Sequence, residues 1–200
     1  MTTTTFELDQ LSHTDRYKLM TGLIVPRPIG WVGTADPDGR LNLAPFSFHT
    51  MVAGTPPTVL FVPGMRERVK DTLANVKATG VFTLNTVSEE VADRMVATSG
   101  EYPPEIDEFE VTGLTPVPGT VVDAPMVAEA PASMECRLTT IVEIGEPPVA
   151  PVVFGEVLRI HVDDAVLDGT RIDHDALRAV GRMAGTGYTT TRDRFERDRP

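Results

Sequence analysis

The stretch Arg27–Thr50 reads RPIGWVGTADPDGRLNLAPFSFHT, and it predicts a β-hairpin. Two runs rich in β-branched, aromatic and aliphatic residues, IGWVGTA and RLNLAPFSF, flank the tetrapeptide DPDG at Asp36–Gly39. DPDG is a strong turn signal, because proline presets φ, aspartate bonds to the local backbone and glycine accepts positive φ. Pro45 cannot donate to a ladder, so the second strand is expected to lie at a sheet edge or to carry a bulge.

The polar residues of this second strand leave two interpretations open. Asn42, Ser47 and His49 interrupt an otherwise apolar run. They fit a plain hairpin with an irregular end. They equally fit an open strand edge, whose free backbone groups would bind a planar ligand rich in donors and acceptors.

Length and composition indicate an ordinary folded protein. The chain has 200 residues, of which 41% are hydrophobic, so we expect one domain. No segment approaches the ~20 apolar residues of a membrane span, and the N-terminus MTTTTFELDQ lacks the features of a signal peptide. The single cysteine, Cys136, excludes an internal disulfide and fits a reducing cytoplasm. It falls in a predicted strand, so we expect a buried, inert thiol.

The formal net charge of −11 argues against nucleic-acid binding and against attachment to anionic lipid. It leaves room for an anionic ligand in a local basic pocket. Arg66, Arg68 and Lys70 form such a cluster just before a helix predicted from Asp71 to about Thr79. Unpaired N–H groups at a helix start, next to cations, suit a phosphate group. We expect Asp71 to cap the helix, with Thr72, Lys70 and an arginine beside the phosphate. The alternative is a solvated charged turn.

Two further segments of the N-terminal half carry specific expectations. Ser12 is predicted to cap a helix that runs to about Thr21 and stops at Gly22, with Tyr17 and Met20 facing the barrel. Arg27 lies between two prolines in extended geometry, which aims its guanidinium group either at a partner or at solvent.

The remaining chain alternates strands with helices. Strands are predicted at 58–62, 81–87, 133–145 and 152–163, and the last two should form an antiparallel hairpin in which Gly155 marks a bulge or a close approach. Helices are predicted at 88–99 and 173–180, with Ser88 capping the first and Val91, Met95 and Val96 in its core stripe. The Pro-rich stretch 101–131 is expected to form a long excursion over one mouth of the barrel.

Familiar catalytic motifs are absent from the sequence. There is no G-x-G-x-x-G after a strand, no G-x-x-x-x-G-K-[ST] and no G-x-S-x-G, which argues against Rossmann, nucleotide-hydrolase and α/β-hydrolase chemistry. Two candidate ligands on one strand face, His161 and Asp163, do not define a metal site, so we expect no metal.

An ordered series of segments resembles the flavin reductase-like family, which binds FMN on a split β-barrel. The series consists of RPIGWVGT, the DPDG turn, NLAPFSF, KDTLANVKATGVFTLNTVSEE, GLTPVPG, SMECRL, GEVLRIHVDD and GRMAGTGY, spanning 23–188. The resemblance implies a mainly β fold with peripheral helices, in a single domain of residues 1–200. The barrel would occupy about 23–165, and a C-terminal helix and tail would occupy 166–200.

The resemblance also implies a cofactor site. Thirteen residues are expected to line it, namely Arg27, Trp31, Asn42, Ala44, Pro45, Phe46, Ser47, Lys70, Asp71, Thr72, Asn85, Arg182 and Tyr188. The edge at 42–47 would follow the flavin ring, and Trp31 would either pack beside the flavin or be an ordinary core residue. Members of the family are typically dimers, so we expect a homodimer with the flavin near the interface, to which the stretch 101–131 would contribute.

The implied reaction is hydride transfer from NAD(P)H to N5 of FMN, which needs no side-chain nucleophile. Electrons would then pass to a partner monooxygenase or another acceptor. One segment departs from the family pattern, because this chain has Phe154–Val157 (FGEV) where shorter flavin reductases carry a Gly-Asp-His segment associated with nicotinamide. The alternatives are therefore an FMN-binding electron carrier of the flavoredoxin type, and a split-barrel protein that has lost flavin.

Overall fold

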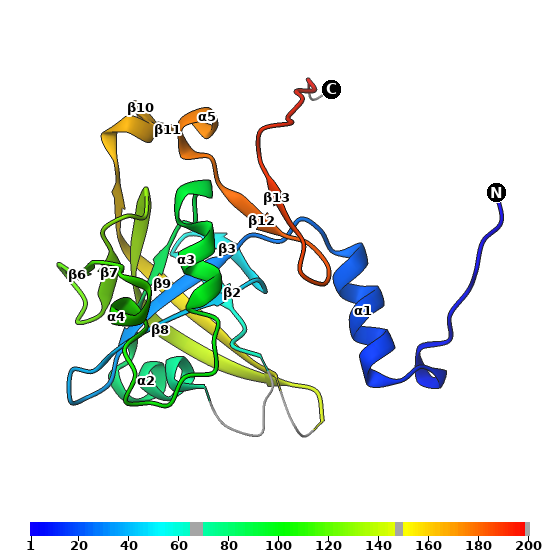
Figure 1. Cartoon of the computed structure of the whole chain (residues 1–200), viewed down its shortest axis with the longest axis horizontal. Helices are drawn as coiled ribbons and strands as arrows, with labels where there is room; N and C mark the ends of the chain where they lie inside the picture. The colour runs from blue at the N-terminus through cyan, green and yellow to red at the C-terminus, as the bar shows by residue number, and fades with distance from the viewer. Residues whose placement is uncertain (65–69, 147–149, 199–200) are drawn as a thin grey trace.

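The computed structural model describes residues 1–64, 70–146 and 150–198. Its centre is an antiparallel sheet of seven strands in the order β2-β1-β5-β8-β9-β4-β3 (Figure 1). The strands are β1 (Gly30–Ala35), β2 (Leu41–Phe46), β3 (His49–Gly54), β4 (Pro57–Phe61), β5 (Val81–Asn85), β8 (Ala132–Ile144) and β9 (Ala150–Val162). The predicted class, a mainly β fold with peripheral helices, is confirmed.

The sheet curls into a split barrel because its two edge strands are consecutive in the chain. β2 and β3 stand at opposite ends of the strand order, yet only Ser47 and Phe48 connect them. So short a connection spans at most about 10 Å, so the two edges must approach each other. His49, the first residue of β3, packs against β1, where a Cβ on Gly30 would lie 2.9 Å from the His49 ring. The end of β2 therefore lies at the split.

The predicted hairpin forms as expected. β1 and β2 pair from Gly30 opposite Phe46 to Ala35 opposite Leu41, and the carboxylate of Asp36 accepts hydrogen bonds from two backbone N–H groups of the turn. β2 is an edge strand, as Pro45 predicts. Pro45 lies two residues after Leu43, so the backbone nitrogens of both residues face away from β1. Proline has no N–H to donate, but at this position no hydrogen bond to β1 is lost.

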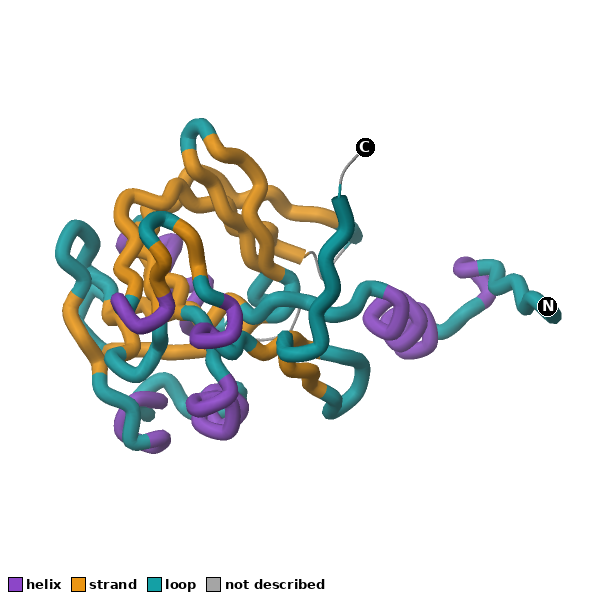
Figure 2. The backbone as a smooth tube through the Cα atoms, turned by 90° about the horizontal axis from the view of Figure 1, so that it is seen from above, coloured by secondary structure: helices purple, strands orange, loops and turns teal. Residues whose placement is uncertain are grey.

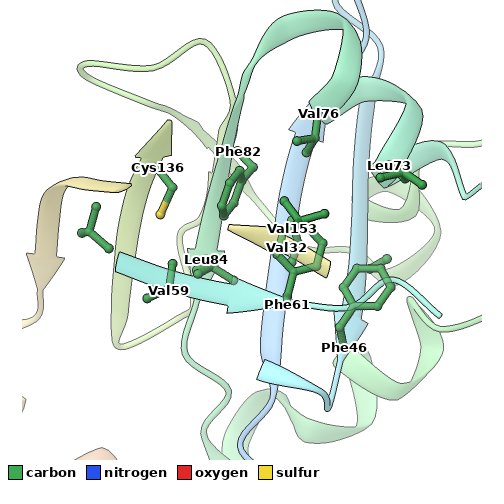
Figure 3. Packing of buried hydrophobic residues seen from close by; sticks show 12 residues of the cluster. Val32, Phe46, Val59, Phe61, Leu73, Val76, Phe82, Leu84, Cys136 and Val153 are labelled. Atoms are coloured by element: carbon green, nitrogen blue, oxygen red, sulfur yellow. The ribbon is translucent and has the colours of Figure 1, made fainter. Parts of the chain in front are cut away.

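An aromatic and aliphatic core fills the barrel. Phe61 stacks on Phe46 with ring centroids 5.4 Å apart and meets Phe82 edge-on at 5.2 Å, and aliphatic side chains surround the three rings (Figure 3). β8 and β9 form the predicted long hairpin, with register shifts on β8. Gly155 of β9 is a point of close approach, because a Cβ there would lie 2.4 Å from the Phe82 ring. Buried Cys136 belongs to this core, and burial raises the pKa of its thiol to about 12.

A second layer covers the outer side of β1 and β2. It contains η2 (Glu89–Val91), α3 (Ala92–Ala97), α4 (Glu108–Thr112), β6 (Pro116–Pro118) and β7 (Pro125–Val127), whereas α2 (Asp71–Thr79) packs Leu73 and Val76 into the barrel core. Val91 and Met95 are buried as predicted, but Val96 is 40% exposed and Ser88 makes no side-chain capping bond, so those two expectations are wrong. The stretch 101–131 folds onto its own sheet, where Phe109, Leu114 and Val127 join the cluster around Trp31.

A buried carboxylate fixes the loop between β6 and β7. Glu135 of β8 is fully buried and accepts hydrogen bonds from Thr120, from the N–H groups of Val121 and Val122, and from His161 at 2.6 Å. Burial alone would raise the pKa of Glu135, but these donors outweigh it and lower the pKa to about 2. His161, a half-buried residue of β9, is thus held by a carboxylate.

The N-terminal helix projects from the body of the molecule. After η1 (Leu8–Gln10), α1 (His13–Leu23) begins with the Ser12 cap as predicted, but it continues through Gly22 (Figures 1 and 2). Tyr17 and Met20 are 55% and 49% exposed, so the expectation that they face the barrel is wrong.

The C-terminal segment completes the fold. It contains η3 (Asp164–Val166), β10 (Leu167–Asp168), β11 (Arg171–Ile172), α5 (His174–Leu177), β12 (Val180–Arg182) and β13 (Tyr188–Thr190). The helix predicted at 173–180 is shorter than expected, because Arg178 adopts a left-handed conformation and the chain continues as β12. Figure 1 shows the β12–β13 hairpin between α1 and the barrel.

Candidate functional site

The start of α2 is a positively charged helix terminus. Lys70 occupies the N-cap position, and its ammonium group lies 6.0 Å from the centroid of the Phe46 ring. The expectation that Asp71 caps the helix is wrong, since Asp71 is the first helical residue. A lysine ammonium only donates hydrogen bonds and cannot accept them from the first-turn N–H groups, so an anion suits this position. Arg66 and Arg68, predicted beside Lys70, lie outside the described residues.

Thr72 faces inward from the same turn. It is 1% exposed, and its hydroxyl accepts a hydrogen bond of 2.9 Å from the Asn42 amide of β2. Asn42 also donates to Thr34 of β1, as does Asn75 of α2. This buried network fastens α2 to the hairpin. Asn42 and Thr72 therefore position the helix start, and both side chains are buried.

The outer edge of β2 is partly occupied by a carboxylate. Glu108 of α4 is 7% exposed and accepts a hydrogen bond of 3.0 Å from the N–H of Leu43. Burial raises the pKa of Glu108. At Leu43, then, the strand edge is closed by the stretch 101–131, and a ligand has access only further along, towards Ser47. Sequence reasoning missed Glu108, because nothing in its local pattern separates it from the neighbouring acidic residues.

Two predicted site residues belong to the core. Trp31 is fully buried, and its indole N–H donates to Thr98 at 2.9 Å. The amide of Asn85 donates to the Trp31 carbonyl and to Thr83, and its oxygen accepts from the Val127 N–H and the Ser133 hydroxyl. These bonds use the full capacity of the Asn85 side chain. The contact of Asn85 with a flavin stays a prediction, one that requires these bonds to be exchanged, and Trp31 is the core residue of the two alternatives.

Arg27 is a buried clamp. Its side chain is neither aimed at solvent nor at a carboxylate, because Nη1 donates to the carbonyls of Thr21 and Ile24, both at 2.7 Å, and Nη2 donates to that of Met183 at 2.9 Å. Nε lies 3.4 Å from the Ser47 hydroxyl. The residue is only 7% exposed. One guanidinium group thus joins the end of α1, the end of β2 and the residue after β12.

Arg182 and Tyr188 lie opposite each other on the β12–β13 hairpin. The guanidinium group of Arg182 is 4.5 Å from the Tyr188 ring centroid and donates to the carbonyl of Gly187. The backbones of Arg27 and Arg182 form an isolated β-bridge. The structure therefore brings Arg182 and Tyr188 beside Arg27 and Ser47.

The predicted residues thus form two groups joined by β2. One group, at the start of α2, contains Asn42, Lys70, Asp71 and Thr72; the other, at the split, contains Arg27, Ser47, Arg182 and Tyr188. Between them, Ala44 and Phe46 are buried and Pro45 is half-buried. From Asn42 to Ser47 an extended strand spans about 17 Å. Lys70 lies beside Phe46, close to the Ser47 end of this strand, so a ligand at the split has a cation near it.

A groove of about 790 Å³ opens beside the second group. We call it the α1 groove; its lining includes Arg16, Met20, Arg27, Phe48, Ile144 and Glu146. Sequence reasoning missed it, because it forms between α1 and the tip of the β8–β9 hairpin, which are more than a hundred residues apart in the chain.

Other site types receive no support. In the part of the chain that the structure describes, no cluster of three or more His, Cys, Asp or Glu side chains is placed to hold a metal ion. Among the described helices, none is both long and apolar enough to span a membrane.

The chain matches known flavin proteins over most of its length. The model of the flavin reductase like domain matches residues 21–180. Nitrilotriacetate monooxygenase component B from Bacillus cereus superposes with a TM-score of 0.94 at 31% identity, covering 98% of this chain and 99% of that one. The 2-nitrobenzoate 2-nitroreductase NbaA from Pseudomonas fluorescens gives 0.89 at 30% identity, covering 98% and 96%. Flavoredoxin from Desulfovibrio vulgaris gives 0.75 at 26% identity, covering 86% and 91%.

The family match and the split-barrel neighbours place the chain in the class of flavin-binding oxidoreductases. Within that class the chain belongs to the flavin reductase-like family.

Replacement of Arg27 should destabilise the protein and release α1. Arg27→Ala leaves three carbonyl oxygens without their charged donor, so we expect the free energy of unfolding to fall by about 3 kcal/mol. Urea denaturation measures the loss, and limited proteolysis should cut near α1. Arg40→Ala is the control, since Arg40 is an exposed guanidinium bonded to Asp36 and should matter much less. Equal stability of the two variants would contradict the clamp.

Proposed function

We propose that this protein is an NAD(P)H:flavin reductase that uses FMN, with the phosphate at the start of α2 and the ring at the end of β2. The observation that carries the proposal is the pair of cations beside the end of the edge strand β2, Lys70 next to Phe46 and Arg27 next to Ser47. The family match over residues 21–180 supports a flavin as the ligand of this surface.

The start of α2 fits a phosphate group. Its N-cap residue is a cation, and α2 is long enough, at nine residues, to present the positive end of a helix dipole. Three other helices have an N-cap side chain that accepts a hydrogen bond from the first turn, which Lys70 cannot do. These N-cap residues are Ser12 for α1, Asp107 for α4 and Asp173 for α5. Thr72 and Asn42 hold the helix start rigidly against β2, which sets the position of Lys70.

The end of β2 fits a planar ring. Beyond Leu43 no side chain of α4 caps the strand among the described contacts, and the backbone around Pro45 and Ser47 is available to polar ring atoms. When bound, FMN supplies the hydride chemistry. The chain supplies placement: half-buried Pro45 supports one side, Ser47 offers a hydroxyl, and Arg27 holds that hydroxyl in position.

An electron carrier of the flavoredoxin type is the second candidate. It is favoured by the segment Phe154–Val157, where Val157 is buried and Glu156 forms an ion pair with Arg137 at 2.8 Å. That segment thus offers no histidine to a nicotinamide. As a reductase, the protein would pass electrons to a monooxygenase or another acceptor, and a cytoplasmic location agrees with its free Cys136.

A homodimer is part of the proposal. The chain exposes 12369 Å² of surface, whereas a compact monomer of 21.7 kDa exposes about 9200 Å². Large apolar side chains are exposed on α1, β3 and the long hairpin, among them Leu23, Ile24, Met51, Val52, Ile144 and Ile160. The stretch 101–131 packs on its own barrel, so α1 replaces it as the arm that reaches a second copy.

The phosphate position predicts a selective effect of Lys70. Lys70→Ala should weaken FMN about tenfold, because one charge-assisted hydrogen bond is lost, and should leave riboflavin unchanged. Lys77→Ala is the matched control, since it removes the same charge from the last turn of α2. Fluorescence titration of flavin-free protein gives both dissociation constants. If the two variants bind FMN equally well, the phosphate lies elsewhere.

Anaerobic mixing distinguishes the two candidate functions. FMN-loaded protein should lose the absorbance of oxidised flavin within seconds of mixing with NADH or NADPH in a stopped-flow instrument. Dithionite is the positive control for a reducible flavin. Bleaching by dithionite together with no response to either nucleotide would reject the reductase and leave the carrier.

Sedimentation tests the dimer. The native chain should sediment at twice its mass of 21.7 kDa. Leu23→Glu places a charge on the most exposed large apolar side chain of α1 and should shift the protein towards monomer, whereas Val111→Glu, on the stretch 101–131, should not. A native monomer that retains FMN would refute the shared site.

A further inference from the structure

The α1 groove is a built cavity of a size that suits a small molecule. Its volume, about 790 Å³, falls within the range of typical ligand sites, which is roughly 300–1,000 Å³. Met20 of α1, Phe48 and Ile144 of β8 supply apolar walls from three separate elements. An aromatic molecule therefore finds surfaces on several sides.

The polar groups of the groove are mainly cationic. Arg16 and Arg27 contribute two guanidinium groups and His13 an imidazole, against the single carboxylate of Glu146. The rest of the chain is strongly acidic, with a net charge of −11. The charge in the groove is thus opposite to that of the molecule, which favours an anion here.

Arg27 makes the groove more than a basic patch. It is buried, yet no carboxylate of the described residues lies within ion-pair distance of it. Four of its five N–H groups are used by three carbonyls and by Ser47, which leaves one N–H of Nη2 for a ligand. A buried, uncompensated charge is costly, and an anion in the groove would offset that cost. The guanidinium carbon lies 5.9 Å from the Phe48 ring centroid, so a cation and an aromatic face adjoin.

We propose that the α1 groove binds an aromatic carboxylate, whose ring packs on Phe48 and Met20 and whose carboxylate faces Arg27 and Arg16. Because Arg27 also contacts Ser47, the ligand lies next to the flavin ring of the proposed function. This part of the inference rests on that function and places the aromatic acid beside the flavin. Binding itself does not require flavin.

Calorimetric titration of the full-length, FMN-loaded protein with 2-naphthoate tests the proposal. Neutral 2-naphthamide, which keeps the rings and loses the charge, should bind at least about tenfold more weakly. Arg16→Ala should weaken 2-naphthoate by a similar factor. Lys18→Ala is the matched control, because it removes the same charge from an exposed position of α1 where Lys18 pairs with Asp15 and does not line the groove. Its dissociation constant should stay within about twofold.

Several results would overturn the proposal. These are no binding of 2-naphthoate, equal binding of the amide, or equal effects of Arg16→Ala and Lys18→Ala. Release of FMN by 2-naphthoate would assign the groove to the flavin itself. If hydrogen-exchange protection of α1 rises with protein concentration and does not change on addition of 2-naphthoate, the groove is occupied by a second copy of the chain. Repeating the titration on flavin-free protein distinguishes the two proposals. If the chain binds 2-naphthoate but does not bind FMN, the proposed flavin function is refuted and the proposed ligand of the α1 groove is supported.

Discussion

The guanidinium group of Arg27 holds together parts of the chain that have little else to fix them to one another. Thr21 is the one residue of α1 that is buried, so the helix gains little from apolar packing. Its orientation depends instead on hydrogen bonds from Arg27 to its last carbonyl groups, which are electron-rich because no further helical turn bonds to them. The same side chain reaches Met183 and Ser47. The shape of the molecule around the split therefore follows from one buried cation between two prolines.

β2 carries three kinds of constraint along six residues. At Asn42 it is tied to α2 through buried amide and hydroxyl groups, and at Leu43 its edge is closed by Glu108. At Phe46 it contributes a ring to the barrel core, and just beyond, at Ser47, it meets Arg27. Each attachment comes from a different element, so the strand cannot shift without breaking several contacts. A ligand surface along this edge is held rigid at both ends, which is what close placement of a planar ring requires.

The sequence predicts the strands better than the contacts of polar side chains. DPDG, Pro45 and Gly155 each carry a local backbone signal, and the structure agrees with all three. Trp31 and Asn85 were expected near the ligand, but they satisfy their hydrogen bonds inside the core with Thr98, Val127 and Ser133. Those partners are distant in sequence, so no local pattern identifies them. The same holds for Glu108 and for the α1 groove, which exist only because remote segments meet. The sequence also does not predict how α1 is oriented relative to the barrel, because the apolar residues of α1 do not form a single stripe.

The distribution of charge gives the surface of β2 its selectivity. In a chain of net charge −11, a distant anion is repelled, and only local cations with a rigid position reverse that repulsion at short range. Two such cations lie near one end of β2, Lys70 beside Phe46 and Arg27 beside Phe48. In both places a positive group lies next to an aromatic ring. A ligand that contacts both groups therefore needs a negative charge and an apolar surface. Nucleic acids and anionic lipids offer charge over a wide area and gain nothing from two narrow points. Small, flat anions fit both features at once, which agrees with the flavin ligand of the proposed function.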